Sequence, residues 1–300
     1  MTPKHIILFL FLMLCPIGMA AQSTITRNKP KPAVTKPKPA TKPKAKPKTK
    51  PAPRRNSTHH SSSTSSTVNL SAELNKLINN MVYVSGGTFT MGGTSEQGSD
   101  AWDDEKPTHS VTLSSYYICK YEVTQALWRA VMGSNPSNFK GDNLPVECVS
   151  WNDCQTFINR LNSYTGRNFR LPTEAEWEFA ARGGNYSRHY KYSGSNYIDD
   201  VAWYGDNSSD RTHPVGTKQA NELGLYDMSG NVWEWCSDWY GSYSSYSQSN
   251  PTGPNGGSSR VRRGGSWSSI ARYCRSSDRG SGTPGGSYDN FGLRLVLSQL

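Results

Sequence analysis

The chain has 300 residues and a formal net charge of +10 at pH 7. The positive charge comes from the first part of the sequence, because all 23 acidic residues lie after residue 67. From residue 68 onward, 20 basic residues stand against those 23 acidic ones, so this part of the chain is slightly acidic. A nucleic-acid-binding domain would carry a basic surface, so we expect no nucleic-acid partner.

Residues 1–21 are typical of a secretory signal peptide. Lys4 and His5 precede an apolar stretch over residues 6–14, and small residues surround a cleavage site after residue 20 or 21. The apolar stretch is too short to span a bilayer comfortably, so we expect no transmembrane segment in the mature chain. The sequence therefore predicts an exported protein, either periplasmic or at the cell surface and extracellular.

Residues 22–67 have the composition of a disordered linker. Lysine and proline alternate between Lys29 and Pro53, and serine and threonine dominate up to Thr67. So few apolar residues cannot form a core, and repeated prolines favour an extended, solvated chain. The segment is either a solvated spacer or a tail that binds anionic polymers of the envelope.

Residues 68–300 are long enough for one domain with a substantial core. All nine tryptophans lie between Trp102 and Trp267, while glycines and turn signals are dense. This composition predicts few long elements and much ordered loop, with the aromatic side chains as packing anchors.

The first predicted elements of this domain alternate between helix and strand. We expect a short helix over residues 71–80, strands on either side of a Gly86-Gly87 turn, and a further strand. The strands cover residues 81–84, 88–91 and 111–121.

Three helices carry their own start and stop signals. Thr124 caps a helix that ends at Gly133, Ser150 opens a capping box for a helix to Gly166, and Thr173 opens another. The third helix ends at the glycine pair 183–184, and beyond it we expect only short strands and loops. Two or three helices followed by loop-rich β structure predict an α+β fold. We interpret the glutamates of the third helix as a structural helix start, not as an acid–base pair.

The histidines of the domain show no ligand spacing. His109, His189 and His213 lie far apart in the sequence. We interpret them as ordinary polar or packed histidines, which argues against an iron or zinc site.

Five short motifs identify the family that the domain resembles. They are RLPTEAEWE at residues 170–178, GNVWEW at 230–235, RGGSW at 263–267, YCR at 273–275 and FGLRL at 291–295. Over residues 81–297 the chain resembles the sulfatase-modifying-factor family, whose formylglycine-generating oxidases convert a sulfatase cysteine to an aldehyde. The resemblance implies a C-type-lectin-like, loop-rich fold.

The resemblance also places a catalytic site on the Gly-Gly-Ser motif. In the oxidases, two cysteines after this motif bind Cu(I) as a bis-thiolate. The second falls on Cys274, but the first position holds Ser269. A serine hydroxyl is a hard ligand that stays protonated near neutral pH, so it cannot replace a thiolate. Cys274 would thus be catalytic, and Cu(I) a cofactor, only in an active enzyme. Ser266 and Trp233 match binding-pocket positions.

A calcium site is the second implication of the resemblance. The family binds Ca²⁺ at positions that fall here on Asp227, Gly230, Val232 and Glu234. Two carboxylates and two backbone carbonyls around a bent loop are the hard oxygen ligands that Ca²⁺ prefers.

Removal of the signal peptide leaves an odd number of cysteines, so at least one has no partner within the chain. Export permits disulfides. Cys236 can supply a second sulfur for copper or form a disulfide with Cys274, and we favour the disulfide; a buried free thiol at Cys274 is the other alternative. The pairing of the rest stays open among Cys119, Cys148 and Cys154.

Three functional hypotheses follow. The favoured one is a non-catalytic module for binding or assembly in a bacterial cell envelope, with an envelope protein or a glycan as its partner. The second is a working formylglycine-generating oxidase that acts on sulfatases. The third is a lectin-like ligand-display protein whose diversified face would be residues 268–290, rich in Ser, Gly, Tyr, Asp and Arg.

Overall fold

A computed structural model describes residues 62–298 of the chain. The predicted signal peptide and residues 22–61 of the predicted linker lie outside this part. No helix within residues 62–298 is long and apolar enough to cross a membrane. The α-helices are α1 (Ser62–Asn79), α2 (Gln125–Met132), α3 (Trp151–Thr165), α4 (Glu174–Ala181) and α5 (Ile198–Val201).

One antiparallel sheet joins the two ends of the domain. Its strand order is β1-β4-β11-β5, so the last strand of the chain lies between two earlier ones. Val296 of β11 pairs with Ile118 on one side and with Arg170 on the other. The strands are β1 (Met81–Val84), β4 (Tyr116–Cys119), β11 (Val296–Leu297) and β5 (Phe169–Arg170).

Two further sheets are mixed. One has the order β10-β6-β8-β9, with β10 parallel to β6, and the other has the order β2-β3-β7, with β7 parallel to β3. The strands of the first are β6 (Trp233–Trp239), β8 (Arg260–Arg263), β9 (Gly280–Gly282) and β10 (Phe291–Gly292). Those of the second are β2 (Gly87–Met91), β3 (His109–Leu113) and β7 (Gln248–Ser249).

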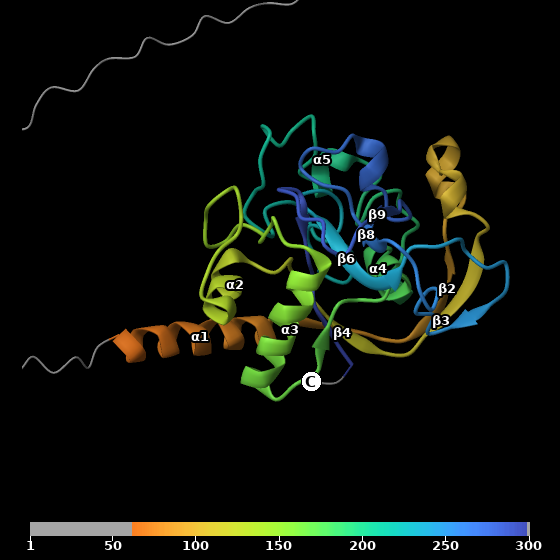
Figure 1. Cartoon of the computed structure of the whole chain (residues 1–300). Coiled ribbons are helices and arrows are strands. Elements are labelled where there is room, and N and C mark those ends of the chain that lie inside the picture. The colour runs from red at the N-terminus through yellow and green to blue at the C-terminus, as the bar shows by residue number, and fades with distance from the viewer. Residues whose placement is uncertain (1–61, 299–300) are drawn as a thin grey trace, which may run out of the picture. The chain divides into compact units, whose positions relative to one another are not determined.

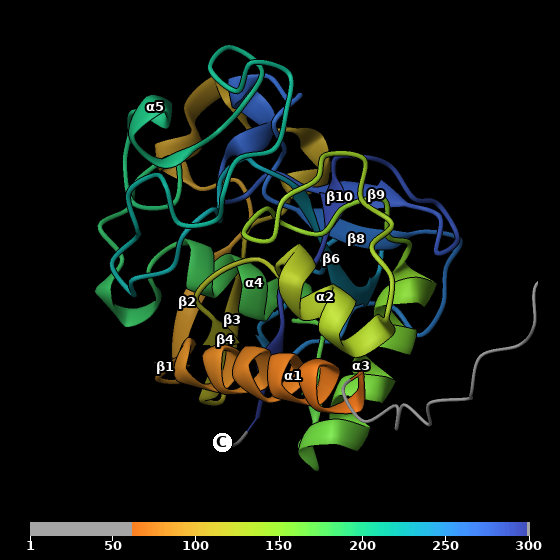
Figure 2. The same cartoon turned by 90° about the vertical axis from the view of Figure 1, so that its left-hand side faces the viewer.

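Helices α1, α2 and α3 gather on one side of the domain (Figure 1). Figure 1 shows α1, α2 and α3 together on one side and the β2–β3 pair on the opposite side, and Figure 2 shows α1 next to α2. Leu77 of α1, Trp128 of α2 and Phe157 of α3 belong to one buried apolar cluster, in which the rings of Trp128 and Phe157 stack 4.7 Å apart. A second cluster packs α4 against β3, β4 and β8.

The predicted helix caps are confirmed. The Thr124 hydroxyl accepts from the backbone N–H of Leu127, and Gly133 ends α2 in the left-handed conformation. Ser150 and Thr173 each form the predicted capping box. These signals are local, because every partner lies within one turn of the helix.

Three predicted elements differ from the structure. The first helix begins at Ser62 and not at residue 71. Gly86-Gly87 does not connect a hairpin, because β1 pairs with β4 while β2 pairs with β3. The strand predicted over residues 111–121 is two strands, β3 and β4, which join different sheets on either side of Ser114-Ser115.

Candidate functional site

The Gly-Gly-Ser motif is a tight turn that follows β8. Gly264 and Gly265 both have positive φ, +96° and +74°. A Cβ on Gly265 would come within 2.6 Å of the Cys274 sulfur and within 2.8 Å of the Tyr273 carbonyl oxygen. The second glycine is therefore required both by its backbone conformation and by the close approach of Cys274.

Ser269 belongs to a cluster of hydroxyl groups. Its Oγ accepts from the backbone N–H of Ser266 at 3.0 Å and lies 3.1 Å from the Ser266 Oγ. Asn290 donates from Nδ2 to Ser268 Oγ at 3.1 Å and to Ser266 Oγ at 3.4 Å. Where the oxidases hold a copper cysteine, this chain holds a hydrogen-bonded, nearly buried hydroxyl.

Cys274 lies at the end of the 3₁₀ helix η4 (Ala271–Cys274) and is fully buried. It packs in a small cluster with Tyr192, Val201 and Tyr204. Burial raises the pKa of the Cys274 thiol, and the negative charge of Asp278 raises this pKa further. Burial thus favours the neutral thiol over the thiolate, which is the form that acts as a nucleophile.

The predicted disulfide between Cys236 and Cys274 is wrong. All five cysteines among residues 62–298 are free thiols. Cys236 belongs to the apolar cluster of α4 and β8, and Cys274 to the cluster of α5. Burial raises the pKa of the Cys236 thiol as well. The donor set near Ser269 therefore does not fit Cu(I), which prefers two thiolates.

Trp233 lies near the serine cluster through Asn290. Its backbone N–H donates to the Asn290 carbonyl at 2.8 Å, while the side chain of Asn290 reaches Ser266 and Ser268. The Arg262 guanidinium covers the Trp233 ring at 4.4 Å. The structure thus brings the two predicted pocket residues, Ser266 and Trp233, into one neighbourhood.

The predicted calcium loop is a strained turn before β6. Asp227, Gly230 and Asn231 all have positive φ. A Cβ on Gly230 would lie 2.3 Å from the Trp203 carbonyl oxygen, so only glycine fits there. The Asp227 Oδ2 accepts from the Gly216 N–H at 2.7 Å.

Three buried carboxylates surround this turn beside one arginine. Both Glu234 oxygens accept from Arg294, at 2.7 and 3.0 Å, and Oε2 also accepts from the Trp177 indole N–H. Glu122 accepts from Val232 N–H at 3.1 Å. Burial raises the pKa of Asp227 to about 6, and burial with repulsion from Asp227 and Glu234 raises that of Glu122 well above its usual value.

This excess of negative charge suits a cation, although the Glu234 oxygens are already occupied by Arg294. Within residues 62–298 no cluster of three or more His, Cys, Asp or Glu side chains has the geometry of a metal site. Glu122 was not a predicted site residue, because it precedes the α2 cap and lies far from the turn in sequence.

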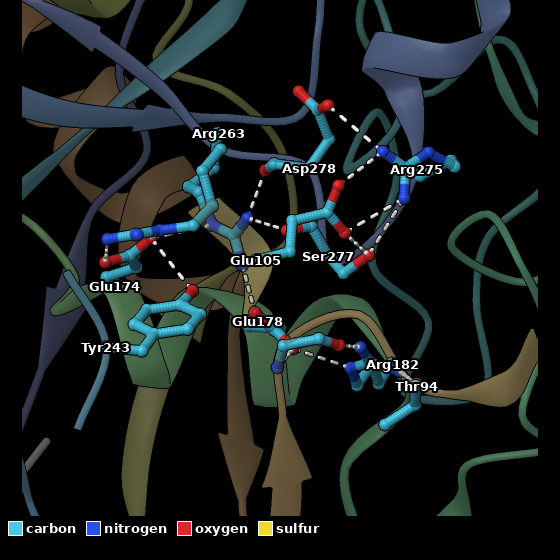
Figure 3. A network of polar contacts seen from close by, with 12 residues as sticks. Thr94, Glu105, Glu174, Glu178, Arg182, Tyr243, Arg263, Arg275, Ser277 and Asp278 are labelled. Atoms are coloured by element: carbon cyan, nitrogen blue, oxygen red, sulfur yellow. Dashed lines mark hydrogen bonds and ion pairs between the residues drawn. The ribbon is translucent and has the colours of Figure 1, made fainter. Parts of the chain in front are cut away.

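A buried ionic network includes Arg263, the residue that precedes the Gly-Gly-Ser turn (Figure 3). Arg263 donates to Glu178 and to the Ser277 carbonyl, and Glu178 also accepts from Arg182 at 2.9 Å. Arg275 forms two hydrogen bonds with Glu105, at 2.5 and 3.0 Å. The glutamates of α4 thus have structural partners, which agrees with their interpretation as part of a structural helix.

Two of the three histidines pack against aromatic rings. His109 meets Tyr243 edge-on at 4.9 Å, and His213 stacks on Trp203 at 3.7 Å. His189 has a positive φ of 58° and is exposed.

These features define a loop-rich α+β domain with a Gly-Gly-Ser turn over a buried thiol. The chain belongs to the sulfatase-modifying-factor family, since the family model described as the sulfatase-modifying factor enzyme 1-like domain matches residues 67–299. The predicted loop-rich α+β fold of the sulfatase-modifying-factor family is thereby confirmed.

Individual relatives carry different names. The chain is 37% identical to the chaperone protein LppX of Paenibacillus barcinonensis, over 74% of this chain and 90% of that protein. It is 33% identical to the formylglycine-generating enzyme of Streptomyces coelicolor, over 72% and 88%. Among solved structures it resembles Treponema denticola variable protein 1, with a TM-score of 0.67, 34% identity, and coverage of 73% and 95%.

Proposed function

We propose that this chain is an exported, non-catalytic sulfatase-modifying-factor protein that serves as a binding or assembly module in a bacterial cell envelope. Its partner would be an envelope protein or a glycan. A relative that is named as a chaperone and is 37% identical supports this proposal, because it shows that not every relative is named as an oxidase.

The proposal rests on the serine at position 269, where the oxidases have a cysteine. Its hydroxyl is held by Ser266, and Cys274 lies nearby as a buried, protonated thiol. Neither group supplies a thiolate, and catalysis in the oxidase family depends on two of them.

Burial also argues against diversified ligand display over the whole of residues 268–290. Residues 274–278 are buried, and Arg275 and Asp278 belong to the ionic network. Free substitution there would leave buried charges without partners, which is strongly destabilising. Variation would be tolerated only at exposed positions such as Ile270 and Tyr288.

Calcium is the metal that we propose for the domain. Asp227 and the carbonyls of Gly230 and Val232 would hold it, with Glu122 close by, and the ion would neutralise a carboxylate excess that Arg294 alone does not balance. Such an ion would fix the strained turn that leads into β6.

The first experiment measures Cu(I) binding and cysteine oxidation by the full mature chain. We would titrate Cu(I) against a chromophoric chelator, and incubate the loaded protein and oxygen with a peptide containing Cys-x-Pro-x-Arg. We expect neither stoichiometric copper nor a mass change of the peptide. Aldehyde formation that Cys274→Ser abolishes would overturn the proposal.

Ser269→Cys provides the matched gain of function. We expect it to bind Cu(I) at least about tenfold more tightly than the wild type, because it restores the missing thiol beside Cys274. Ser268→Cys is the control, since it adds a thiol at the exposed neighbouring position. Equal copper affinity of the wild type and Ser269→Cys would show that Ser269 is not the reason for inactivity.

A further inference from the structure

A cavity lies outside the Gly-Gly-Ser turn, whose residues do not line it. It has a volume of about 420 Å³ and is formed by the start of α4, the end of β6 and the loop 241–254. This volume is within the range of small-molecule sites. Glu174 and Ala175 of the RLPTEAEWE motif lie in its wall, but none of the residues predicted to bind copper, calcium or a pocket ligand does.

Two buried carboxylates line this cavity. Glu174 is 5% exposed and Asp238 is 3% exposed. Glu174 is neutralised by Arg279, whose Nε and Nη2 donate to its two oxygens at 2.6 and 2.8 Å. No ion pair among residues 62–298 includes Asp238.

The two hydrogen bonds of Asp238 both end on Oδ2. They come from the Glu174 backbone N–H at 3.0 Å and from the Ser237 hydroxyl at 2.8 Å. Oδ1 lies close to Gly253, which also lines the cavity; a Cβ on this glycine would be 3.3 Å from Oδ1. Burial, and then repulsion from Glu174, raises the pKa of Asp238 to about 7. The carboxylate is thus short of positive charge.

Aromatic rings form part of the same wall. Tyr243 and Trp239 both line the cavity. The Arg279 guanidinium lies 3.9 Å from the Tyr243 ring centre, and the Arg260 guanidinium lies 3.5 Å from that of Trp239. The faces of such rings attract cations, and here each ring already carries a guanidinium group. The carboxylate of Asp238, which has no ion pair within the described residues, is therefore what the wall offers to a further cation.

We propose that this cavity binds a primary ammonium group on a short aliphatic chain, as in a lysine side chain, with Asp238 as its counter-ion. The ammonium donates to Oδ1 of Asp238, and the methylene groups contact Tyr243 and the loop 241–254. An anion is disfavoured because it would face the Asp238 carboxylate, which no ion pair in the described part of the chain neutralises. The proposal goes beyond the function proposed above and does not depend on whether Cys274 is catalytic.

The test uses the full mature chain and 1,5-diaminopentane as the probe, measured by isothermal titration calorimetry at pH 8. We expect saturable binding of the diamine and none of 1,5-pentanediol, which has the same length without charge. Asp238→Asn should weaken binding at least about tenfold, while Asp142→Asn, an exposed control, should not. Equal binding of diol and diamine would overturn the proposal.

A blocking variant keeps the test valid if Asp238→Asn does not fold. Ser242 is exposed and lines the cavity, so Ser242→Trp fills the space without a change of charge. We expect this variant to lose diamine binding and to keep the melting temperature of the wild type. Full diamine affinity in a folded Ser242→Trp protein would place the ligand elsewhere.

The pH dependence gives an independent readout. Glu174 and Glu176 of α4 raise the pKa of Asp238, the Ser237 hydroxyl and the Glu174 N–H lower it, and Asp238 ionises as the pH rises through about 7. The charges of Arg260 on β8 and Arg170 on β5 also act on Asp238, and His109 and Arg279 line the cavity. We expect diamine affinity about tenfold lower at pH 6 than at pH 8. This difference should vanish in Asp238→Asn, and its persistence there would contradict the assignment to Asp238.

Discussion

Arg263, Arg275 and Arg294 are fully buried, and each has a carboxylate partner that is also buried. Such pairs contribute little net stability relative to apolar residues of the same volume, but removal of one partner is costly because the other charge stays buried. The arginines of the RGGSW, YCR and FGLRL motifs are therefore each fixed to a buried glutamate, and through it to one arrangement of the chain.

Glu178 is a residue where this cost should be large. It accepts from Arg263, from Arg182 and from the Gly92 N–H. We expect Glu178→Gln to lower the free energy of unfolding by about 3–5 kcal/mol, because the buried Arg263 guanidinium loses its paired carboxylate, while Arg182 keeps Glu96. Urea unfolding at pH 7 measures this loss in the free energy of unfolding.

The matched control is Asp142→Asn, which breaks the exposed pair with Arg129. Asp142→Asn should lower the free energy of unfolding by less than about 1 kcal/mol. Similar losses for the two variants would mean that Glu178 is not held in a desolvated network.

At the scale of elements, sequence and structure agree where the signal is local. Thr124, Ser150 and Thr173 could be identified as caps because each bonds to a backbone group three residues along the chain. Strand pairing is not local: β1 and β2 are neighbours in sequence, yet they join different sheets. From the sequence alone, two short strands joined by two glycines predict a hairpin. The true pairing becomes clear only when the partner strand of each is known.

We predict that calcium binds at the turn that begins at Asp227 and stabilises the folded protein. We expect the melting temperature to be several degrees higher in 1 mM CaCl₂ than in excess EDTA, because an ion that binds only the folded state adds about 2.7 kcal/mol at one hundred times its dissociation constant. Asp227→Asn should remove this difference, as measured by differential scanning calorimetry. A calcium response that survives in Asp227→Asn would place the ion elsewhere.

At the scale of the whole molecule, contacts distant in sequence determine both the core and the site. The sequence predicts a Cys236–Cys274 disulfide for one cysteine that follows the GNVWEW motif and one within YCR, but residues in or beside family motifs are not necessarily neighbours in space. The same limit applies to Asp238: its cavity is formed by α4, β6 and the loop 241–254, which no local pattern joins.

The last strand, β11, also depends on contacts with strands that are distant in sequence. Val296 is fully buried and lies between β4 and β5. We expect Val296→Asp to abolish cooperative unfolding, because it places an unpaired charge in the centre of a sheet. Ser298→Asp, two residues on and exposed, should unfold like the wild type. Near-ultraviolet circular dichroism during urea titration distinguishes the two, and a cooperative Val296→Asp protein would show that β11 is dispensable.

The position of β11 also has a consequence for the order of events in the cell. A ribosome delivers the chain from its N-terminus, so β4 and β5 emerge long before the strand that must separate them. The first sheet cannot be complete before β11 has emerged, and its high contact order predicts slow closure. A chain that stops short of β11 therefore contains no native form of that sheet, even when β1, β4 and β5 have all been made.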